Sequence, residues 1–541
     1  MNLLKDPWLP LKHKNGEIRY HQVSSITSSD IIDLALPRAD FQGAAYQFLI
    51  GLLHTALAPE DTDQWLEQFS DPPSSVELDQ ALAPFIDSFF LDSDGPSFMQ
   101  DYDSLENENA VPASSLLIDA PGANTIKNNT DHFVKAGRAD TFCPDCSAIA
   151  LFTMQINAPS GGKGYRTGLR GGGPLTTLVM PESPDTPLWQ KLWLNVLDRE
   201  TFEHPESDPD SPHLFPWMGP TRTSEHGEQT RLDDVHPFQM FWSMPRRFRL
   251  AFENIDSYCD LCGRHSHSVV SKVRVRNYGI NYDGPWRHPL TPYRRDPKKP
   301  EEPPISIKGQ PGGIGYRHWE SLVLEDKEDH GNLPAPVVLD YPRKVDEAAM
   351  GNTTLPRIAR IWAFGYDMDN MKPRCWYAAQ VPLIALPPSK QDRLLDWLKV
   401  LLNLAQASAM QVRNEVKGAW FKNPKEVKGD LTFVENRFWE RTEHTFYQLL
   451  KELAQRLIEQ EVSRLPPEPA AQWFRHVQSQ AIEVFDEFAL SGPADTANMK
   501  RITHARNQLL SWFTRNKTAK DFRKQAGIER TNTTNTKKEP S

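Results

Sequence analysis

The chain has 541 residues, of which 39% are hydrophobic and 10% aromatic, and its 61 Lys and Arg residues face 71 Asp and Glu residues for a formal charge of −10. This composition excludes a wholly disordered chain, and the net acidity excludes binding of nucleic acid through bulk charge alone. Because single cores stop growing near about 250 to 300 residues, we expect at least two domains.

The first residues, Met1 to Leu11, place Lys5 and Asp6 directly behind a short apolar stretch, which does not match a signal peptide. The most apolar run, Tyr46 to Ala58, is interrupted by His54 and falls short of the ~18 residues that a membrane span needs. The sequence therefore predicts a cytoplasmic protein that has no membrane partner.

Residues 1–385 mix short β-branched or aromatic runs with Gly and Pro, with dense proline clusters at 205–220 and 297–304. A helical stretch is expected at 44–58. Such frequent Gly and Pro residues interrupt regular elements, and they favour an irregular α+β domain with long surface loops over repeated βαβ units.

The pattern changes after Pro387 and Pro388. Ser389 is expected to cap a helix, and further amphipathic helices are expected from about Val434, after Pro469 and from Asp495. Four such helices predict a four-helix bundle over 386–530. The polar tail 531–541 is expected to be disordered.

Four of the five cysteines form two CxxC pairs, Cys143/Cys146 and Cys259/Cys262. Each pair can present two sulfurs to one Zn²⁺, so we expect a closed structural zinc site that staples distant segments of the first domain. The alternatives are two unrelated turns or a redox CxxC, although the βαβ context of a redox motif is not visible. His265 and His267 are expected to be ordinary surface residues or neighbours of the metal ligands, and Cys375 a small buried apolar residue.

A glycine-rich stretch follows the first CxxC pair, from Ala158 to Gly173. It lacks the order of a Walker phosphate loop. Glycines allow close approach to a groove or phosphate, and Lys163, Arg166 and Arg170 add charge beside Tyr165. Contact with nucleic acid and a tight surface turn both remain open interpretations.

Two segments are locally basic, Lys272 to Lys299 with eight basic and two acidic residues, and Lys500 to Arg530 with nine and two. Each is compatible with a nucleic-acid contact or with a solvated face.

Several motifs in their joint order carry a family resemblance. They are Leu4 to Pro10, Leu36 to Asp40, Phe98 to Gln100, the two CxxC pairs around the glycine stretch, Gly168 to Gly172, and Gly365 to Met371. Together they make the chain resemble, over nearly its whole length, the CasA family, the large subunits of the type I-E Cascade complex of bacterial CRISPR immunity.

The resemblance implies a non-catalytic subunit that reads the protospacer-adjacent motif of double-stranded DNA, from the minor-groove side, and helps to open the duplex for the guide RNA. The family's glycine loop falls on Ser160, Gly161, Gly162, Lys163 and Gly164, with Lys163 interrupting the glycines. No lysine aligns cleanly with the family's lysine finger, so Arg276 is the first choice there and Arg274 the second.

The family's wedge hairpin matches Asp369, Asn370 and Met371, with Asn370 in place of the family's glutamine. Flanking residues 361–366 and 374–381 are expected to be strands, and a plain surface turn is the alternative. The resemblance also implies a loop, at about 124–140, that contacts the CRISPR RNA 5′ handle and the motif region.

In that loop, Phe133 is the stacking candidate that the resemblance implies, with Lys135 and Arg138 as charges, although a phenylalanine judged on sequence alone is more often a core residue. The implied partners are the other Cascade protein subunits, the CRISPR RNA 5′ handle, double-stranded target DNA and the helicase-nuclease.

Two other functions remain open. An enzyme would need a catalytic metal or an acid and base pair, but neither HExxH nor the deaminase pattern of H-x-E with P-C-x-x-C occurs. A purely structural scaffold would use the glycine loop and the basic segments as ordinary surface.

Overall fold

The computed structural model describes residues 1–120, 137–309, 312–325, 331–351, 354–369, 372–491 and 498–528. These fold into two compact units. Unit 1 comprises Met1–Gly313 and Ser321–Ala385, and unit 2 comprises Ile314–Glu320 and Leu386–Ser541. Within the described ranges, no helix is both long enough and apolar enough to cross a membrane.

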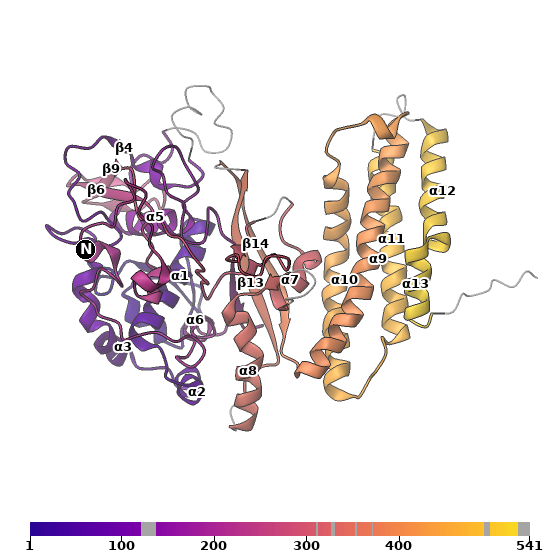
Figure 1. Ribbon diagram of the computed structural model, residues 1–541, viewed down its shortest axis with the longest axis horizontal. Coiled ribbons are helices and arrows are strands. Elements are labelled where there is room, and N and C mark those ends of the chain that lie inside the picture. The colour runs from indigo at the N-terminus through magenta and orange to yellow at the C-terminus, as the bar shows by residue number, and fades with distance from the viewer. Residues whose placement is uncertain are drawn as a thin grey trace, which may run out of the picture. The chain divides into compact units, whose positions relative to one another are not determined.

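Unit 1 begins with a small antiparallel sheet of order β2-β1-β3, formed by β1 (Leu9–His13), β2 (Ile18–His21) and β3 (Ile31–Leu34). The long helix α1 (Ala39–Leu57) follows and is buried along most of its length (Figure 1). The shorter helices of unit 1 are α2 (Thr62–Ser70), α3 (Ser75–Leu82), α5 (Pro144–Asn157), α6 (Leu188–Trp193) and α8 (Pro336–Met350).

An aromatic cluster around Phe48 of α1 forms the core of unit 1. The Phe48 ring meets the rings of Trp8, Phe98, Phe152 and Trp242 edge to face, at centroid distances of 5.6 to 5.9 Å. Edge-to-face packing stabilises such pairs beyond the burial of their area. The high aromatic content of the sequence is used here to join elements that are far apart in the chain.

Two three-stranded sheets of unit 1 carry most of the predicted site. One has the order β4-β9-β6, from β4 (Ala110–Pro112), β9 (Val269–Arg276) and β6 (Arg247–Glu253). The other has the order β14-β13-β5, from β5 (Thr176–Met180), β13 (Ile358–Asp369) and β14 (Lys372–Ile384). The expected strands at 361–366 and 374–381 are thereby confirmed and are longer than the sequence indicated.

The remaining strands of unit 1 are short. β10 (Tyr293–Arg294), β11 (Ile305–Ser306) and β12 (Asn332–Leu333) form a sheet of order β11-β10-β12, and β7 (Ser257–Tyr258) pairs with β8 (His265–Ser266). The short helix α7 (Trp319–Val323) begins in unit 2 and ends in unit 1.

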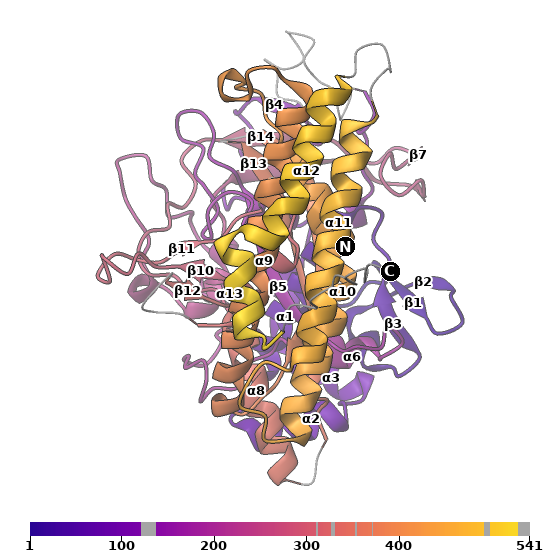
Figure 2. The same cartoon turned by 90° about the vertical axis from the view of Figure 1, so that its right-hand side faces the viewer.

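Unit 2 is helical, with α9 (Pro388–Trp420), α10 (Thr432–Glu459), α11 (Pro467–Ala489), α12 (Met499–Arg515) and α13 (Lys517–Gln525). Helix α9 packs against each of the other four, and the long helices run side by side (Figure 2). Their apolar residues lie in the core of the unit, as their helical spacing predicted.

Three helix starts differ from the sequence expectation. Helix α11, expected after Pro469, begins at Pro467, so Pro469 lies inside its first turn. Helix α9 begins at Pro388 after Pro387, which makes no side-chain cap, so Ser389 lies inside the first turn and is not the cap. Proline suits this first position because it has no N–H to satisfy. Helix α12 begins at Met499, where Asn498 accepts a hydrogen bond from the backbone N–H of Arg501, while Asp495 lies outside the described residues.

The fold is therefore mixed α/β with a helical C-terminal region, as expected at that level. A short segment that precedes this region by some 70 residues, Ile314–Glu320, belongs to unit 2 as well. Its Tyr316 is fully buried against Phe446, with ring centroids 4.3 Å apart, and shares a hydrogen bond with Thr442.

Candidate metal centre and nucleic-acid interface

The two CxxC pairs occupy local structures that point their sulfurs inward. Cys143 is the N-cap of α5, with Pro144 in the first turn, and its Sγ accepts from the backbone N–H of Cys146. Cys259 and Cys262 lie in the turn between β7 and β8, which Gly263 closes with φ of +73°. This left-handed conformation suits glycine.

The four sulfur atoms all lie within 4.8 Å of one another, and Cys143 Sγ lies 3.8 Å from Cys262 Sγ. A tetrahedral zinc site with Zn–S bonds of about 2.3 Å requires sulfurs about 3.8 Å apart. Three of the cysteines are buried and Cys262 is half-buried. The donor set and its spacing therefore fit a closed tetrathiolate zinc site.

The four thiols strongly shift one another's pKa values. Hydrogen bonding with Cys143, then with Cys259 and Cys262, raises the pKa of Cys146, and burial adds to that. Hydrogen bonding with Cys143 and Cys146 lowers the pKa of Cys262 to about 7. Four thiolates at this distance repel one another unless a cation lies between them. A divalent metal ion would neutralise this negative charge.

Hydrogen bonds near the cysteines join the α5 segment to β9 and to the β7–β8 turn. Phe142 and Val270 exchange backbone hydrogen bonds of 3.0 and 2.8 Å. The Asp260 carboxylate accepts from the backbone N–H groups of Asp140 and Thr141, both at 2.8 Å. The cysteine cluster thus lies where β9 begins and fixes the start of that strand.

His265 and His267 are exposed and lie near Asp256 in a group separate from the four cysteines. As expected, they are surface residues. They contribute no ligand to the cysteine cluster.

The glycine-rich stretch from Ala158 to Gly173, which contains Ser160 to Gly164 and is called the glycine loop from here on, follows α5 directly and closes on itself. Gly168 donates to Ala158 O at 2.9 Å, and Gly173 donates to Asn157 O at 3.1 Å, so the two ends of the loop meet at the end of the helix. Ser160, Gly162 and Lys163 are exposed, whereas Gly161 and Gly164 are half-buried. A Cβ at Gly162 would meet nothing within 4 Å, so this glycine faces open space.

Both arms of the loop dock on neighbouring elements. Gly164, with φ of +80°, accepts a hydrogen bond from Tyr278 N at 2.8 Å, just beyond the end of β9. A Cβ on Gly173 would lie 2.6 Å from Met368 Cγ on β13. The glycine loop, the end of β9 and the hairpin strand β13 therefore pack together within unit 1.

The basic side chains around the loop differ in how available they are to bind a ligand. Lys163 is exposed and forms no ion pair among the described residues. Arg166 is held by Ser224, to which its Nε and Nη2 donate at 2.7 and 2.9 Å. Arg170 is buried, and its guanidinium donates to Thr176, Thr291 and Gln47. Lys163 is the one of these three that is available to a ligand.

Strand β9 carries Lys272, Arg274 and Arg276 at alternate positions, so all three lie on one face of the sheet. Arg276 is exposed and paired with Glu108 at 3.5 Å and Asp103 at 3.9 Å. Arg274 is half-buried and Lys272 exposed, and neither has an ion pair within the described part of the chain. Lys272 was not among the predicted site residues, although its spacing from Arg274 and Arg276 carries the signal.

The predicted wedge is the connection between β13 and β14. The two strands pair along their length up to Asp369 and Lys372, which face each other and are both exposed. Near the tip, Arg374 forms an ion pair with buried Asp367, at 2.6 Å. Asn370 and Met371 lie outside the described residues, as do Phe133 and Lys135 of the handle loop, while Arg138 is exposed.

A pocket of about 430 Å³ lies beside the part of this hairpin that is nearer its tip. It is lined by Arg38, Ala39, Asp40, Asp119, Tyr366, Pro373, Arg374, Cys375 and Trp376. Cys375 is exposed here, so the expectation of a buried apolar cysteine is wrong. The residue lies on β14 where that strand leaves the protein interior.

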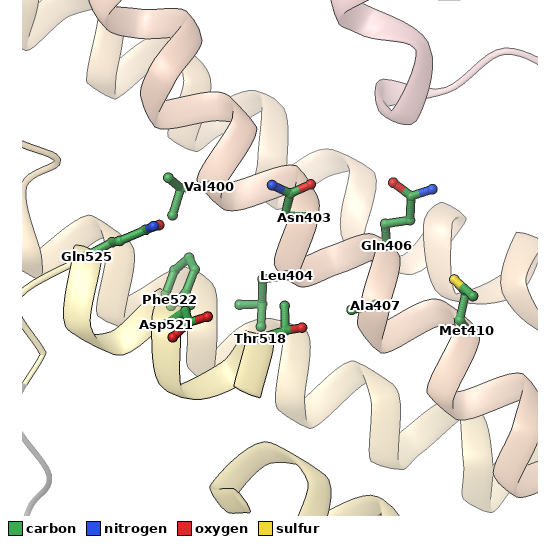
Figure 3. A pocket seen from close by; sticks show the side chains of 10 residues that line it. All are labelled: Val400, Asn403, Leu404, Gln406, Ala407, Met410, Thr518, Asp521, Phe522 and Gln525. Atoms are coloured by element: carbon green, nitrogen blue, oxygen red, sulfur yellow. The ribbon is translucent and has the colours of Figure 1, made fainter. Parts of the chain in front are cut away.

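Unit 2 has a separate groove of about 410 Å³ between α9 and α13. Figure 3 shows Asn403, Gln406 and Met410 on the α9 side and Thr518, Asp521 and Phe522 on the α13 side. None of the predicted site residues lines it.

Comparison with known proteins settles the family. The family model for CRISPR-associated protein Cse1 matches residues 2–484. The chain belongs to the Cse1 family. The resemblance to the CasA family drawn from the sequence is thereby confirmed.

Solved structures of this family share the fold at low identity. CasA (Cse1) of Thermus thermophilus is 18% identical with a TM-score of 0.66, over 94% of this chain and 99% of that one. Cse1 of Thermobifida fusca is 16% identical with a TM-score of 0.65, over 98% and 99%. A chain of a structure described as a CRISPR RNA-guided surveillance complex is 15% identical with a TM-score of 0.62, over 94% and 99%.

Proposed function

We propose that this Cse1 family member is the non-catalytic large subunit of a CRISPR RNA-guided surveillance complex, in which it recognises the protospacer-adjacent motif of double-stranded DNA and helps to open the duplex. The observation that carries the proposal is the packing of the glycine loop against both the end of β9 and the hairpin strand β13. One compact surface thus combines a loop that can approach DNA closely, basic side chains and a projecting hairpin.

The glycine loop is the proposed motif reader. Its exposed backbone around Gly162 has no side chain to keep a minor groove at a distance. The minor groove offers a degenerate pattern of donors and acceptors, so a backbone reader accepts several related motifs. Lys163 supplies a charge for a phosphate, and guide pairing then reads the remaining target sequence.

Strand β9 supplies the proposed finger beside the loop. The sequence favours Arg276 for this finger, with Arg274 second. The ion pairs of Arg276 with Glu108 and Asp103 favour Arg274, whose charge is not already neutralised. Lys272 lies on the same face, two residues further from the loop.

The connection Asp369-Asn370-Met371 is the proposed wedge. Two long paired strands support it, and the Arg374–Asp367 ion pair stiffens them near the tip. Side chains that wedge into a base step offset an unstacking cost of about a few kcal/mol. The loop 124–140, with Phe133, Lys135 and Arg138, is proposed to contact the CRISPR RNA 5′ handle.

Cys143, Cys146, Cys259 and Cys262 are proposed to hold one structural Zn²⁺. The four sulfurs use all four tetrahedral positions, so the metal would supply a fixed crosslink and no catalytic centre. In unit 2, α9, α10, α11 and α12 are proposed to form a four-helix bundle that contacts other Cascade protein subunits. The assembled subunit is proposed to support recruitment of the helicase-nuclease.

A matched pair of glycine variants tests the motif reader. Gly162→Asp adds a carboxylate in open space on the loop, and Gly95→Asp adds one at another glycine that likewise has nothing within 4 Å and no positive φ. In the RNA-bearing complex, Gly162→Asp is expected to abolish motif-dependent duplex binding, whereas Gly95→Asp binds normally. Motif-dependent binding by Gly162→Asp at the parental affinity would refute the proposed reader.

The wedge is tested by replacing Asp369, Asn370 and Met371 with glycine. Initial motif binding is expected to persist, while strand separation, followed by a fluorescent base analogue beside the motif, slows. A duplex already mismatched beside the motif should restore the rate. Opening of fully paired targets at the parental rate would make this segment an ordinary turn.

A further inference from the structure

Arg246 is a buried cation directly beneath the glycine loop. It follows Pro245, immediately precedes β6 and is only 6% exposed. Its guanidinium donates from Nη2 to the carbonyl of Pro159, the residue where the loop begins. No carboxylate among the described residues pairs with it, and burial lowers its pKa to about 10, so it remains a cation at neutral pH.

The other two nitrogens of this guanidinium, Nε and Nη1, are buried and have no hydrogen-bond partner. Buried polar groups are nearly always paired, and an unpaired cationic donor is a costly exception. The neighbouring residue, Arg247, shows the usual solution, because it is buried against Asp101 and also pairs with Asp103. Arg246 therefore has donor capacity that the folded chain does not use.

Tyr165 of the glycine loop covers this cation. The Arg246 guanidinium lies 4.6 Å from the centre of the Tyr165 ring, and the tyrosine side chain is 40% exposed. On its other side Tyr165 packs against the bare backbone of Gly161, where a Cβ would lie only 2.5 Å from the tyrosine Cβ. A partly exposed ring in a glycine-rich turn can rotate away without displacing a packed core.

We propose that Arg246 is a concealed phosphate-binding residue: when the backbone of target DNA reaches the glycine loop, Tyr165 moves off the guanidinium, and the two unpaired donors bind a phosphodiester oxygen. The proposal rests on the glycine loop being the DNA reader, as argued above. It adds a contact between Arg246 and the DNA phosphate backbone. This contact forms only when DNA lies on the glycine loop, since the cation is otherwise shielded from solvent anions.

The test measures how duplex affinity depends on salt in the RNA-bearing complex. Each phosphate that a protein neutralises contributes about 0.9 to the slope of log K against log salt concentration. Between 50 and 200 mM salt, wild type should therefore lose about 3.5-fold more affinity than Arg246→Gln. Arg246→Lys, which keeps the charge, should retain most of the wild-type slope.

Arg170→Gln is the matched control. Arg170 is another buried arginine of the same loop without a carboxylate partner, but its donors are occupied by Thr176, Thr291 and Gln47. Its replacement should leave the salt slope unchanged even if stability falls. An unchanged salt slope of duplex affinity in Arg246→Gln would overturn the proposal. So would a variant that changes only the salt dependence of complex assembly on RNA, measured without DNA.

A second measurement needs no substitution at Arg246. Phenylglyoxal modification of this arginine, followed by mass spectrometry, should be slow in the wild-type complex, faster in Tyr165→Ala, and suppressed in Tyr165→Ala by motif-bearing duplex. Equal labelling with and without duplex would overturn the proposal. If Gly162→Asp abolishes motif binding while Arg246→Gln behaves as wild type, only the Arg246 proposal falls; if Gly162→Asp binds normally, the reader itself falls.

Discussion

Removal of metal from the cysteine cluster is expected to destabilise unit 1 and to leave unit 2 unchanged. Cys143 and Cys262 are 119 positions apart, so a bound Zn²⁺ closes a long loop in the unfolded chain. A crosslink that closes a loop of about 100 residues contributes about 4.7 kcal/mol by restricting the unfolded state. Spread over the roughly 380 residues of unit 1, this corresponds to a fall in Tm of about 6 °C.

The apoprotein is expected to remain folded near the cluster at moderate temperature. The bonds from Asp140 and Thr141 to Asp260 and the ion pair of Arg264 with Asp145, at 2.6 Å, need no metal. They hold the two segments together, although they do not crosslink the unfolded chain. Removal of the metal is therefore expected to lower the Tm of unit 1 while its fold at moderate temperature is retained.

The assay is calorimetry of the full chain before and after dialysis against a chelator, with zinc content measured by elemental analysis. Cys259→Ser should reproduce the chelated state, and Cys375→Ser, which alters the exposed fifth cysteine, should melt as wild type. The transition of unit 2 is an internal control. A well-folded preparation that contains no zinc, or a unit 1 transition that chelation does not move, would refute the reasoning.

Two further predictions concern stability. His54 is buried, donates from Nδ1 to Ile50 O and accepts from Leu197 N, and burial lowers its pKa from 6.5 to about 3. The unfolded chain then binds the proton first, so this contribution is complete above pH 6.5 and is lost as the pH falls toward 3; by pH 5 the loss amounts to about 2 kcal/mol. Denaturant titrations from pH 7 to 5 should show a shallower loss for His54→Gln, and parallel curves would count against this role. Tyr316→Ala should destabilise unit 2 by about 3 to 5 kcal/mol, and Tyr316→Phe, which removes only the bond to Thr442, by about 1 kcal/mol. Equal urea midpoints for the two variants would contradict the packing of this ring.

The sequence predicted elements whose signal is local. The helices of the C-terminal region follow from helical spacing of apolar residues, and the grouping of the cysteines follows from thiolate chemistry. The helix start at Pro388 was misplaced by two positions, because Ser389 suits a cap while proline suits the first turn. The exposure of Cys375 was missed because the residue lies on a strand whose outer half leaves the core.

What the sequence could not supply are contacts between remote segments. Nothing near Arg246 in the chain indicates that Tyr165, some 80 positions earlier, covers it. The docking of Gly173 against Met368 joins segments almost 200 positions apart, and only the fold brings them together. The number of basic residues on β9 was visible, but the neutralisation of Arg276 by Glu108 and Asp103 was not.

The membership of Ile314–Glu320 in unit 2 has a consequence for synthesis. Tyr316 leaves the ribosome more than 120 residues before Thr442 and Phe446, the residues that bury it. The N-terminal part of unit 1 can therefore begin to collapse during translation, whereas the segment around Tyr316 cannot pack until helix α10 has been synthesised. A fragment that starts at residue 386 would lack the ring altogether and would expose the apolar seat that Phe446 and Trp473 form around it.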